Sequence, residues 1–575
     1  MKQLNFLSAA LLAAAVVIAT PAANATTVKV LGAGSSAMWQ TAAIGAFNQL
    51  AGAGAQHFTI KGTCTSGANC AQIHDSRLAT IFNETGNLWV VWNSTETEVW
   101  AYISVDSVVG NRAYFAVPRT TLQLDPMTEN GGFPSGDTNL IASGLWGLDA
   151  AVLPASVYTA LNNASITTAF TDIRPEDAKY ASCRVLDQLN ATTYLGLGYG
   201  TGTTCTTQQG TSILSDFSTA TANPVNYNIK GTDPITGKTV PKFTSIDVGA
   251  TPVVFIVNRS NPNGLGYGGT GTPSIVDLTV ADAQGLWNGT ECDTNQFGGS
   301  PLNIIPPTDT PVYVMEREPM SGTMNTTEFS LFRCGTSAAG NYTGAQCQVT
   351  GTANEHNSQE KHVVPANGAG TGPGTSMNPL DLTCLAGGGT RQRAIGTGEM
   401  DSTAVYKTTD SIGYTFWGFG NVSKLAGSAD YGYLTLDGVD PIQAIYTNGE
   451  LPVCISGGVS GVCPATPGTT FPNLRNGTYK AWSMLRVVTN ASGVALTNTV
   501  ILVNAIQNNV NTTVPDFVPY GAVGGDPGMK YYRSHYTQSG YGPNNGLSGE
   551  TETGGDMGGC IEPVGSAPGV TGCHQ

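Results

Sequence analysis

Continuous apolar runs that alternate with amphipathic stretches constrain this chain more than any other feature of its sequence. Residues 88–92 (LWVVW) form a continuous apolar run, as expected for a strand buried on both faces of a parallel sheet. The run at 251–258 (TPVVFIVN), within 248–258, predicts another strongly buried strand. From Trp39 onward the apolar residues fall at positions 42, 43, 46, 47 and 50, which is the spacing of a helix with one buried face. This alternation predicts an α/β fold with a parallel or mixed sheet.

Shorter patterns predict the remaining elements. Further β-rich runs predict strands at 28–31, 58–61, two within 104–119, 311–315, 410–419, 431–438 and 482–488. Other segments are read as helices, at 71–82, 279–290, 323–332 and 500–510. The stretches between them are rich in Gly, Thr and Asn, which predicts long loop-rich insertions into the α/β framework.

The first residues have the pattern of a secretory signal peptide. Lys2 precedes an apolar run from Phe6 to Ile18, and the small-residue motif Ala23-Asn24-Ala25 predicts cleavage after Ala25. No Cys at the predicted cleavage site could carry a lipid anchor, so we expect a periplasmic or secreted protein. The apolar run is too short to span a bilayer, and no later stretch reaches the ~20 apolar residues of a membrane helix. We therefore expect no membrane insertion.

Charge and cysteine content narrow the possible partners. The formal net charge of −15 argues against nucleic acid and acidic membranes, because both require a basic surface. Twelve cysteines in an exported chain indicate disulfides rather than zinc, since no C-x-x-C occurs. We expect no metal and no cofactor. Closeness in the sequence predicts four disulfide pairs, namely Cys64–Cys70, Cys183–Cys205, Cys454–Cys463 and Cys560–Cys573. The partners of the other four cysteines stay open.

Two strand–turn–helix segments could hold a small anion. One is GAGSSAMW at 32–39, and the other is REPMSGT at 317–323. Backbone N–H groups at a helix start and nearby hydroxyls favour an anion, and Arg317 adds a planar guanidinium that can bind an oxyanion in a bidentate manner. Each segment also has an interpretation without a ligand. The first could be a tight connection between a strand and a helix, and the second could be a capped helix with Arg317 on the surface.

Taken in order, these landmarks resemble the phosphate-binding proteins of phosphate ABC importers, in the type-2 periplasmic binding-protein superfamily. The family begins with strand–GAGA(T/S)–helix, which GAGSSA at 32–37 matches. Its R-x-x-x-S-G-T motif is matched by Arg317, Ser321, Gly322 and Thr323, and its crossing strand by residues 251–258. The match covers about 300 of the 550 residues that follow the predicted signal peptide.

The resemblance implies a fold, a ligand and a set of site residues. The fold would be a two-lobed α/β Venus flytrap with mixed sheets flanked by helices. The ligand would be phosphate or a similar small oxyanion, held by Ser35, Ser36, Ala37, Ser66, Asn93, Arg317, Ser321, Gly322 and Thr323. The family also has an Asp after the third strand that accepts the proton of hydrogen phosphate and repels sulfate. Asn93 or Ser94 is the nearest counterpart in VVWNSTETEVW, with Glu96 a little further on. An Asn at this position differs from the family's Asp, because its amide can donate a hydrogen bond as well as accept one.

The same comparison divides the chain. We expect a signal peptide at 1–25, the first part of lobe 1 at 26–120, and an insertion at 121–245. Lobe 2 would follow at 246–410, with its own insertion at 335–400. Residues 411–520 would return to lobe 1 and supply the closing elements, and 521–575 would form a Gly-rich C-terminal tail.

The predicted function is capture of phosphate or a similar small oxyanion for uptake, by a monomer that could deliver it to an ABC permease, with no catalysis. A secreted hydrolase is a weaker alternative, because neither G-x-S-x-G nor H-E-x-x-H occurs and the six His lie in polar segments. A second alternative is a secreted surface protein that keeps the binding-protein scaffold without transport. The long insertions and many cysteines favour that alternative over a lean importer subunit.

Overall fold

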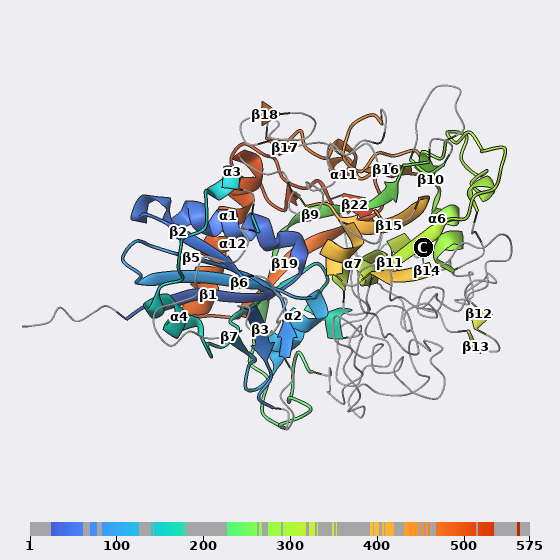
Figure 1. Ribbon diagram of the computed structural model, residues 1–575. Coiled ribbons are helices and arrows are strands. Elements are labelled where there is room, and N and C mark those ends of the chain that lie inside the picture. Colours follow the sequence, from blue (N-terminus) through green and yellow to red (C-terminus); the bar gives the residue numbers. More distant parts are fainter. Residues whose placement is uncertain are drawn as a thin grey trace, which may run out of the picture.

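The computed structural model describes residues 25–60, 70–77, 83–125, 140–179, 227–266, 274–331, 391–418, 431–459 and 467–533, with short gaps inside several of these ranges, and the short strands at 348–349, 352–353 and 561–563. Within this part of the chain, helices pack on both sides of one large mixed sheet, whose strands run through two lobes (Figure 1). The predicted α/β fold class is confirmed.

The sheet has thirteen strands, and its main path runs β14-β11-β15-β9-β19-β8-β1-β6-β5-β2. Lobe 1 contains the end of this path, namely β8 (Thr168–Thr171), β1 (Thr27–Gly34), β6 (Glu98–Ser104), β5 (Asn87–Trp92) and β2 (Gln56–Ile60). Lobe 2 contains β14 (Arg391–Ala394), β11 (Tyr313–Arg317) and β15 (Ser411–Phe416), with β16 (Tyr431–Leu436) and β10 (Asp277–Leu278) off the main path. The short strand β20 (Val518–Pro519) is also off the main path and pairs with Gly249 and Ala250 of β9.

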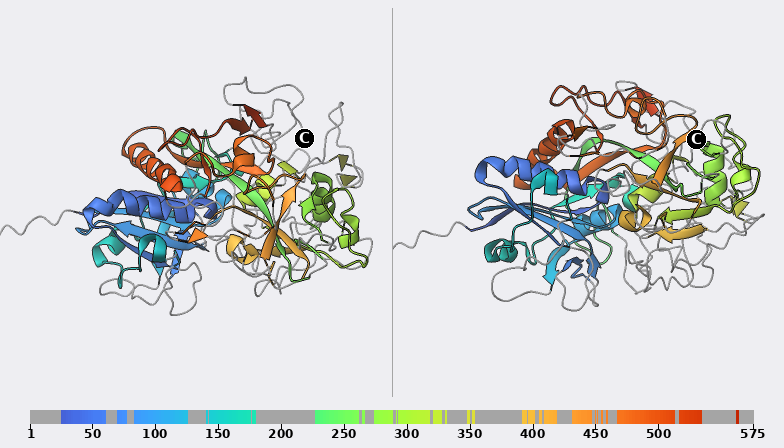
Figure 2. Two further views of the ribbon diagram at one scale, coloured as in Figure 1. Left: turned by 90° about the horizontal axis from the view of Figure 1, so that it is seen from above. Right: turned by 45° about the horizontal axis from the view of Figure 1, so that its top comes forward.

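Two long strands join the lobes. The first part of β9 (Phe243–Asn258) pairs antiparallel with β19 (Trp482–Asn490), and its second part pairs with β15 and β16. Consequently one strand belongs to the sheets of both lobes, and the two views of Figure 2 show it passing through the middle of the molecule. The run at 251–258 is apolar because all of its residues are buried.

Helices cover both faces of the lobe 1 sheet. On one face α1 (Trp39–Leu50) packs beside α12 (Val494–Thr512), above Trp89 and Val91 of β5. On the other face α2 (Ser107–Phe115) and α4 (Ala155–Leu161) cover Leu88 and Val90. β5 is thus apolar throughout because successive side chains enter two different cores. It is nevertheless antiparallel to both of its neighbours, so the parallel arrangement expected for residues 88–92 is wrong.

In lobe 2, α6 (Val280–Asn288) packs on the sheet through one large aromatic side chain. The ring of Trp287 lies 5.7 Å from that of Phe255 on β9 and 5.4 Å from that of Tyr414 on β15, measured between ring centroids. A second helix, α7 (Gly322–Thr327), follows β11 and lies between the lobes. The helices expected from Trp39 onward and at 279–290 are confirmed.

Two sequence predictions of secondary structure are wrong. Residues 71–82 were expected to be helical, but β3 (Cys70–His74) pairs antiparallel with β7 (Thr121–Asp125) and with β4 (Asn83–Thr85). The run 104–119 was expected to form two strands, but most of it is α2. All nine residues of α2 are buried, so apolar residues do not mark a single helical face.

The observed topology also differs from the predicted division. β8 lies beside β1 in the lobe 1 sheet, although its residues fall in the expected insertion at 121–245. Likewise β14, from the expected insertion at 335–400, is an edge strand of lobe 2 and pairs with β11. β15 and β16 belong to lobe 2, whereas residues 411–520 were expected to return to lobe 1. Most of the two insertions, the predicted signal peptide and most of the predicted cysteine pairs lie outside the described residues.

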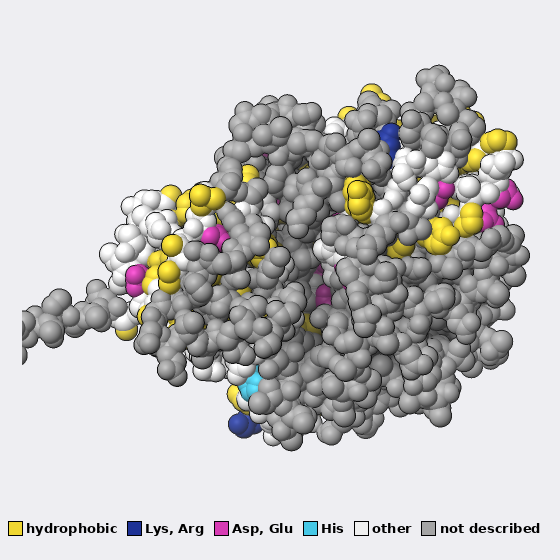
Figure 3. All heavy atoms as spheres, in the orientation of Figure 1, with side chains coloured by type: hydrophobic (Ala, Val, Ile, Leu, Met, Phe, Trp, Pro, Cys, Tyr) yellow, Lys and Arg dark blue, Asp and Glu magenta, His cyan; other side chains and the backbone are white. Residues whose placement is uncertain are grey.

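Within the described residues, no helix combines the length and the apolar character required to cross a membrane. On the face shown in Figure 3, the described Lys and Arg side chains are scattered and form no basic patch.

Candidate functional site

The carboxyl ends of three strands meet at one edge of the lobe 1 sheet. β1 runs parallel to β6 and to β8, and Gly34 at its end lies opposite Ser104 and Phe170. Gly34 has a φ of +142°, and a Cβ there would lie only 1.9 Å from the carbonyl oxygen of Phe170, so the close approach requires glycine. The residues just beyond these strand ends therefore share this edge: Ser35, Asp106 and Asp172.

Lobe 2 presents a matching edge. β11 runs parallel to β14, and Arg317 at the end of β11 lies opposite Ala394. The short helix α9 (Gly396–Glu399) follows β14, which brings Thr397 to the Arg317 side chain. The Arg317 Nη1 donates to Thr397 Oγ1 at 2.9 Å.

The two edges touch each other across the boundary between the lobes. The hydroxyl oxygens of Ser36 and Thr397 lie 2.8 Å apart. The Arg317 Nη2 lies 3.6 Å from Asp106 Oδ1, and both side chains are at most one-tenth exposed. The two strand–turn–helix segments singled out in the sequence thus reach the same boundary, where Thr397 contacts both Ser36 and Arg317.

Asp172 is a second carboxylate at this junction, and it is fully buried. The Oγ of Ser35 donates to Asp172 Oδ2 at 3.2 Å, and the Oγ of Ser107 donates to Asp172 Oδ1. Burial raises the pKa of Asp172 to about 6, although both serine hydroxyls and the charge of Arg317 lower it. At neutral pH this carboxyl is therefore mostly ionised.

The start of α7 lies directly against Asp172. Ser321 caps the helix, because its Oγ accepts from the backbone N–H of Met324 at 3.3 Å. A Cβ on Gly322 would lie 1.6 Å from Asp172 Oδ1 and 2.6 Å from Ser107 Oγ. The glycine of the R-x-x-x-S-G-T motif thus allows a carboxylate from lobe 1 to approach the lobe 2 helix.

The structure brings most of the predicted site residues together. Ser35, Ser36, Ala37, Arg317, Ser321, Gly322 and Thr323 all lie on the segments at the junction. The backbone N–H of Ala37 donates to Ser35 Oγ at 3.1 Å. Ser66 lies outside the described residues.

Asn93 lies away from the other predicted site residues. Asn93 lies in the turn between β5 and β6, where its Oδ1 accepts from the backbone N–H groups of Thr97 and Glu98 at 2.9 and 3.1 Å. Glu98 pairs with Thr27, at the opposite end of the eight-residue strand β1 from Ser35. At ~3.3 Å per strand residue this places Asn93 about 20 Å from the junction.

Four residues at the junction were missed in the sequence analysis. Asp106 directly precedes α2, at the lobe 1 edge of the junction. Asp followed by Ser before Val108-Val109 is a helix-start pattern that could have indicated α2. Asp172 and Thr397 carry no comparable local pattern. The missed residues are Asp106, Ser107, Asp172 and Thr397.

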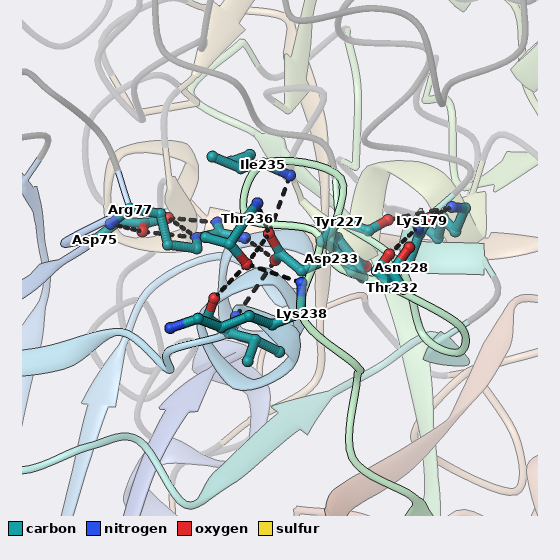
Figure 4. A network of polar contacts seen from close by, with 11 residues as sticks. Asp75, Arg77, Lys179, Tyr227, Asn228, Thr232, Asp233, Ile235, Thr236 and Lys238 are labelled. Atoms are coloured by element: carbon teal, nitrogen blue, oxygen red, sulfur yellow. Dashed lines mark hydrogen bonds and ion pairs between the residues drawn. The ribbon is translucent and has the colours of Figure 1, made fainter.

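A buried charge network anchors the far end of α2, whose first residue is Ser107 of the junction (Figure 4). Arg77 Nε donates to Asp75 Oδ1 at 2.8 Å, and Arg77 Nη1 lies 2.5 Å from Asp233 Oδ2. Asp233 also accepts from the backbone N–H of Val117, just beyond α2, at 3.3 Å. Burial raises the pKa of Asp75, but Arg77 and Arg112 outweigh this effect and lower it overall.

His57, the one His buried in the described part, lies away from the junction. Its Nδ1 lies 3.0 Å from Asp149 Oδ1 and its Nε2 lies 2.8 Å from the carbonyl oxygen of Trp146. The ring stacks on Trp146 with a centroid distance of 3.9 Å. Since both ring nitrogens have protein partners, His57 acts as a packing residue. Among the described residues, no three His, Cys, Asp or Glu side chains are grouped as metal ligands would be.

Comparison with known proteins gives matches among solved structures only. No protein-family model matches the chain, and no curated protein does. A phosphate-binding protein from Stenotrophomonas maltophilia is 14% identical, with 86% of this chain and 85% of that chain covered and a TM-score of 0.33. The high-affinity periplasmic phosphate-binding protein PfluDING is 14% identical, with 84% and 90% covered and a TM-score of 0.30.

An ABC-type phosphate transport receptor from Vibrio cholerae is 12% identical, with 46% of this chain covered and a TM-score of 0.24. The chain spans 66% of that receptor, just under two thirds of its length. These phosphate-binding proteins are what the chain is similar to in fold.

Proposed function

We propose that this protein is an exported solute-binding protein that captures phosphate, or a similar small oxyanion that carries a proton, between its two lobes. The observation that supports this most is the position of Arg317. Its guanidinium lies at the lobe boundary within reach of Thr397 and Asp106, and Thr397 in turn contacts Ser36.

The chemistry of these groups suits a protonated oxyanion. Arg317 supplies a positive charge and paired N–H donors, and the hydroxyls of Ser36, Ser321 and Thr323 can donate further hydrogen bonds. The Asp106 carboxylate can accept a hydrogen bond from a protonated oxygen of the ligand. Each charge-assisted hydrogen bond contributes ~1.5–3 kcal/mol, so four or five of them can reach the ~8 kcal/mol of micromolar binding.

Capture requires the lobes to part and close again. Ser36 belongs to lobe 1 and Thr397 to lobe 2, so their contact must open when an anion enters. The long strands β9 and β19 connect the lobes and can bend at their middle, as in hinge closure around a ligand. An ABC permease is the partner we propose for transport. Export is supported by the signal-peptide pattern and by the disulfide bond of Cys70.

The experiment is calorimetric titration of the purified protein with phosphate, with Arg317→Ala as the test variant. We expect wild type to bind phosphate and Arg317→Ala to lose at least about a hundredfold in affinity while keeping its circular dichroism spectrum. Lys480→Ala is the matched control, because it also removes one positive charge but from a side chain 44% exposed. Equal phosphate affinity in wild type and Arg317→Ala would refute the assignment.

A further inference from the structure

Two fully buried tyrosines, one in each lobe, contact the backbone of the two segments at the junction, and the function proposed above does not use them. Tyr102 on β6 donates from its phenol to the backbone oxygen of Ser35. Tyr414 on β15 accepts at its phenol oxygen from the backbone N–H of Arg317 at 3.3 Å. Both side chains are 0% exposed, so these contacts are made in the interior of the lobes.

In lobe 1 the turn after β1 is held at three points of Ser35. Its backbone N–H donates to the carbonyl oxygen of Phe170 at 2.9 Å, and its hydroxyl donates to Asp172 at 3.2 Å. Its carbonyl oxygen accepts from Tyr102. The ring of Tyr102 stacks on Phe170 with centroids 4.4 Å apart and packs edge-on against Trp89 at 6.2 Å. Burial and the nearby Asp172 raise the pKa of the Tyr102 phenol, so it keeps the hydrogen that it donates.

In lobe 2 the phenol of Tyr414 takes the place of a strand partner. Within the described strands, β15 pairs with β11 at Tyr313 and Val314, and the pairing ends there. Three residues further on, the N–H of Arg317 points to the Tyr414 phenol instead of to a carbonyl oxygen of β15. A buried backbone N–H requires an acceptor, and this phenol supplies it. The ring of Tyr414 lies against Trp287 of α6, which fixes its position.

Both contacts act on peptide groups next to the groups that would bind the anion. Ser36 directly follows Ser35, and its hydroxyl reaches the boundary between the lobes. Arg317 carries the guanidinium itself. A set of ligand-binding groups must be held within about 0.5 Å of its productive geometry by neighbours that packing locks in place. The two buried phenols meet this description, since aromatic rings hold each of them.

We propose that Tyr102 and Tyr414 are positioning residues, which fix the backbone of Ser35 and Arg317 and thereby place the Ser36 hydroxyl and the guanidinium for the anion. This inference rests on the proposed function. Neither phenol contacts the anion, because each acts through one peptide group. The hydroxyl and not the ring performs this role, which separates it from core packing.

The test uses Tyr102→Phe and Tyr414→Phe, which remove one hydroxyl each and keep the rings. Tyr479→Phe is the matched control, because its fully buried phenol also contacts the backbone, at the carbonyl oxygen of Val253 on β9, but it bonds to neither junction segment. Calorimetric titration with phosphate should give an affinity about fivefold to tenfold below wild type for Tyr102→Phe and for Tyr414→Phe. Tyr479→Phe should bind within about twofold of wild type, although all three variants should lose similar free energy of unfolding in chemical denaturation.

A spectroscopic measurement reports on the positioning in the absence of any ligand. Selective labelling of arginine with ¹⁵N gives a backbone amide resonance for Arg317, which Arg317→Lys identifies through its loss. Tyr414→Phe removes the acceptor of this amide and should shift its resonance. Tyr479→Phe should leave the resonance in place.

Each result decides the question. If wild type binds phosphate and both test variants bind it as well as Tyr479→Phe does, the inference is wrong and the proposed function stands. An Arg317 resonance that does not move in Tyr414→Phe overturns the lobe 2 half of the inference. If one test variant does not fold, the other decides. If wild type binds no phosphate, the proposed function fails, and the inference falls with it.

Discussion

Ser36 and Thr397, which lie 361 positions apart in the sequence, share a contact of 2.8 Å between their hydroxyl oxygens. Thr397 also accepts a hydrogen bond from Arg317, so its hydroxyl stands between the lobe 1 turn and the guanidinium. An anion that binds Arg317 must rearrange this hydroxyl or use it as a further donor. Thr397 therefore belongs to the proposed site, although its local sequence resembles no known anion motif.

Replacement of Thr397 tests its share in ligand binding. Thr397→Ala removes the hydroxyl, and we expect phosphate affinity to fall about fivefold to tenfold, since one hydrogen bond contributes ~1–1.5 kcal/mol. Thr397→Ser keeps the hydroxyl and should bind within about twofold of wild type. Calorimetric titration of both variants gives the comparison. Equal losses in the two variants would assign the effect to packing of the methyl group.

Gly322→Ala tests the contact between α7 and Asp172. The new Cβ would lie 1.6 Å from Asp172 Oδ1, so the carboxylate or the helix must move. We expect a loss of ~1–3 kcal/mol in the free energy of unfolding, measured by chemical denaturation, as for other overpacked sites.

The double variant Gly322→Ala, Asp172→Ala provides the control for this contact. With the carboxylate removed, the added methyl group should cost much less than it does alone, which gives a coupling energy of at least ~0.5 kcal/mol. Strictly additive losses would mean that the two residues do not compete for the same space.

Asp172 should also make stability depend on pH. Its pKa is about 6 in the folded protein, above the ordinary value of 3.8, so the folded state binds its proton more tightly than the unfolded state. The stabilisation that it contributes is therefore fully present below about pH 4 and is lost as pH rises through about 6. The loss should reach up to about 3 kcal/mol, from ~1.4 kcal/mol per pKa unit.

Denaturation of wild type and Asp172→Asn at pH 4.5 and pH 7 measures this effect. The free energy of unfolding of wild type should fall relative to that of the variant between the two pH values. A difference between the proteins that does not change with pH would show that Asp172 has the same pKa in both states.

The network of Asp75, Arg77 and Asp233 should be needed for the fold. Arg77→Ala would leave two buried carboxylates without their guanidinium, and we expect a loss of ~3–5 kcal/mol in the free energy of unfolding. Lys480→Ala, which breaks the exposed pair with Asp437, should cost less than ~1 kcal/mol. Thermal denaturation of both variants distinguishes these cases. Similar melting temperatures for the two would contradict the assigned role of Arg77.

Local sequence patterns were enough to predict the helices and strands that position the site residues. The apolar spacing after Trp39 predicts α1, and the run at 251–258 predicts the buried half of β9, because periodicity and composition within a few residues determine such elements. The motifs at 32–37 and 317–323 could be read as helix starts for the same reason. Where a helix is buried on all sides, as α2 is, its sequence shows no helical periodicity. The prediction of two strands within 104–119 failed for this reason.

The composition of the junction depends on which strands pair in parallel. Asp106 and Asp172 come beside Ser35 because β6 and β8 flank β1 in register, and Thr397 comes beside Arg317 because β14 pairs with β11. Asn93 also follows a strand, namely β5, but β5 runs antiparallel to β6. Asn93 therefore lies at the opposite edge of the sheet from the junction. The sequence by itself determined the helix starts and the guanidinium. Only the tertiary structure decided which carboxylates face them, because strand order and direction depend on contacts between residues far apart in the chain.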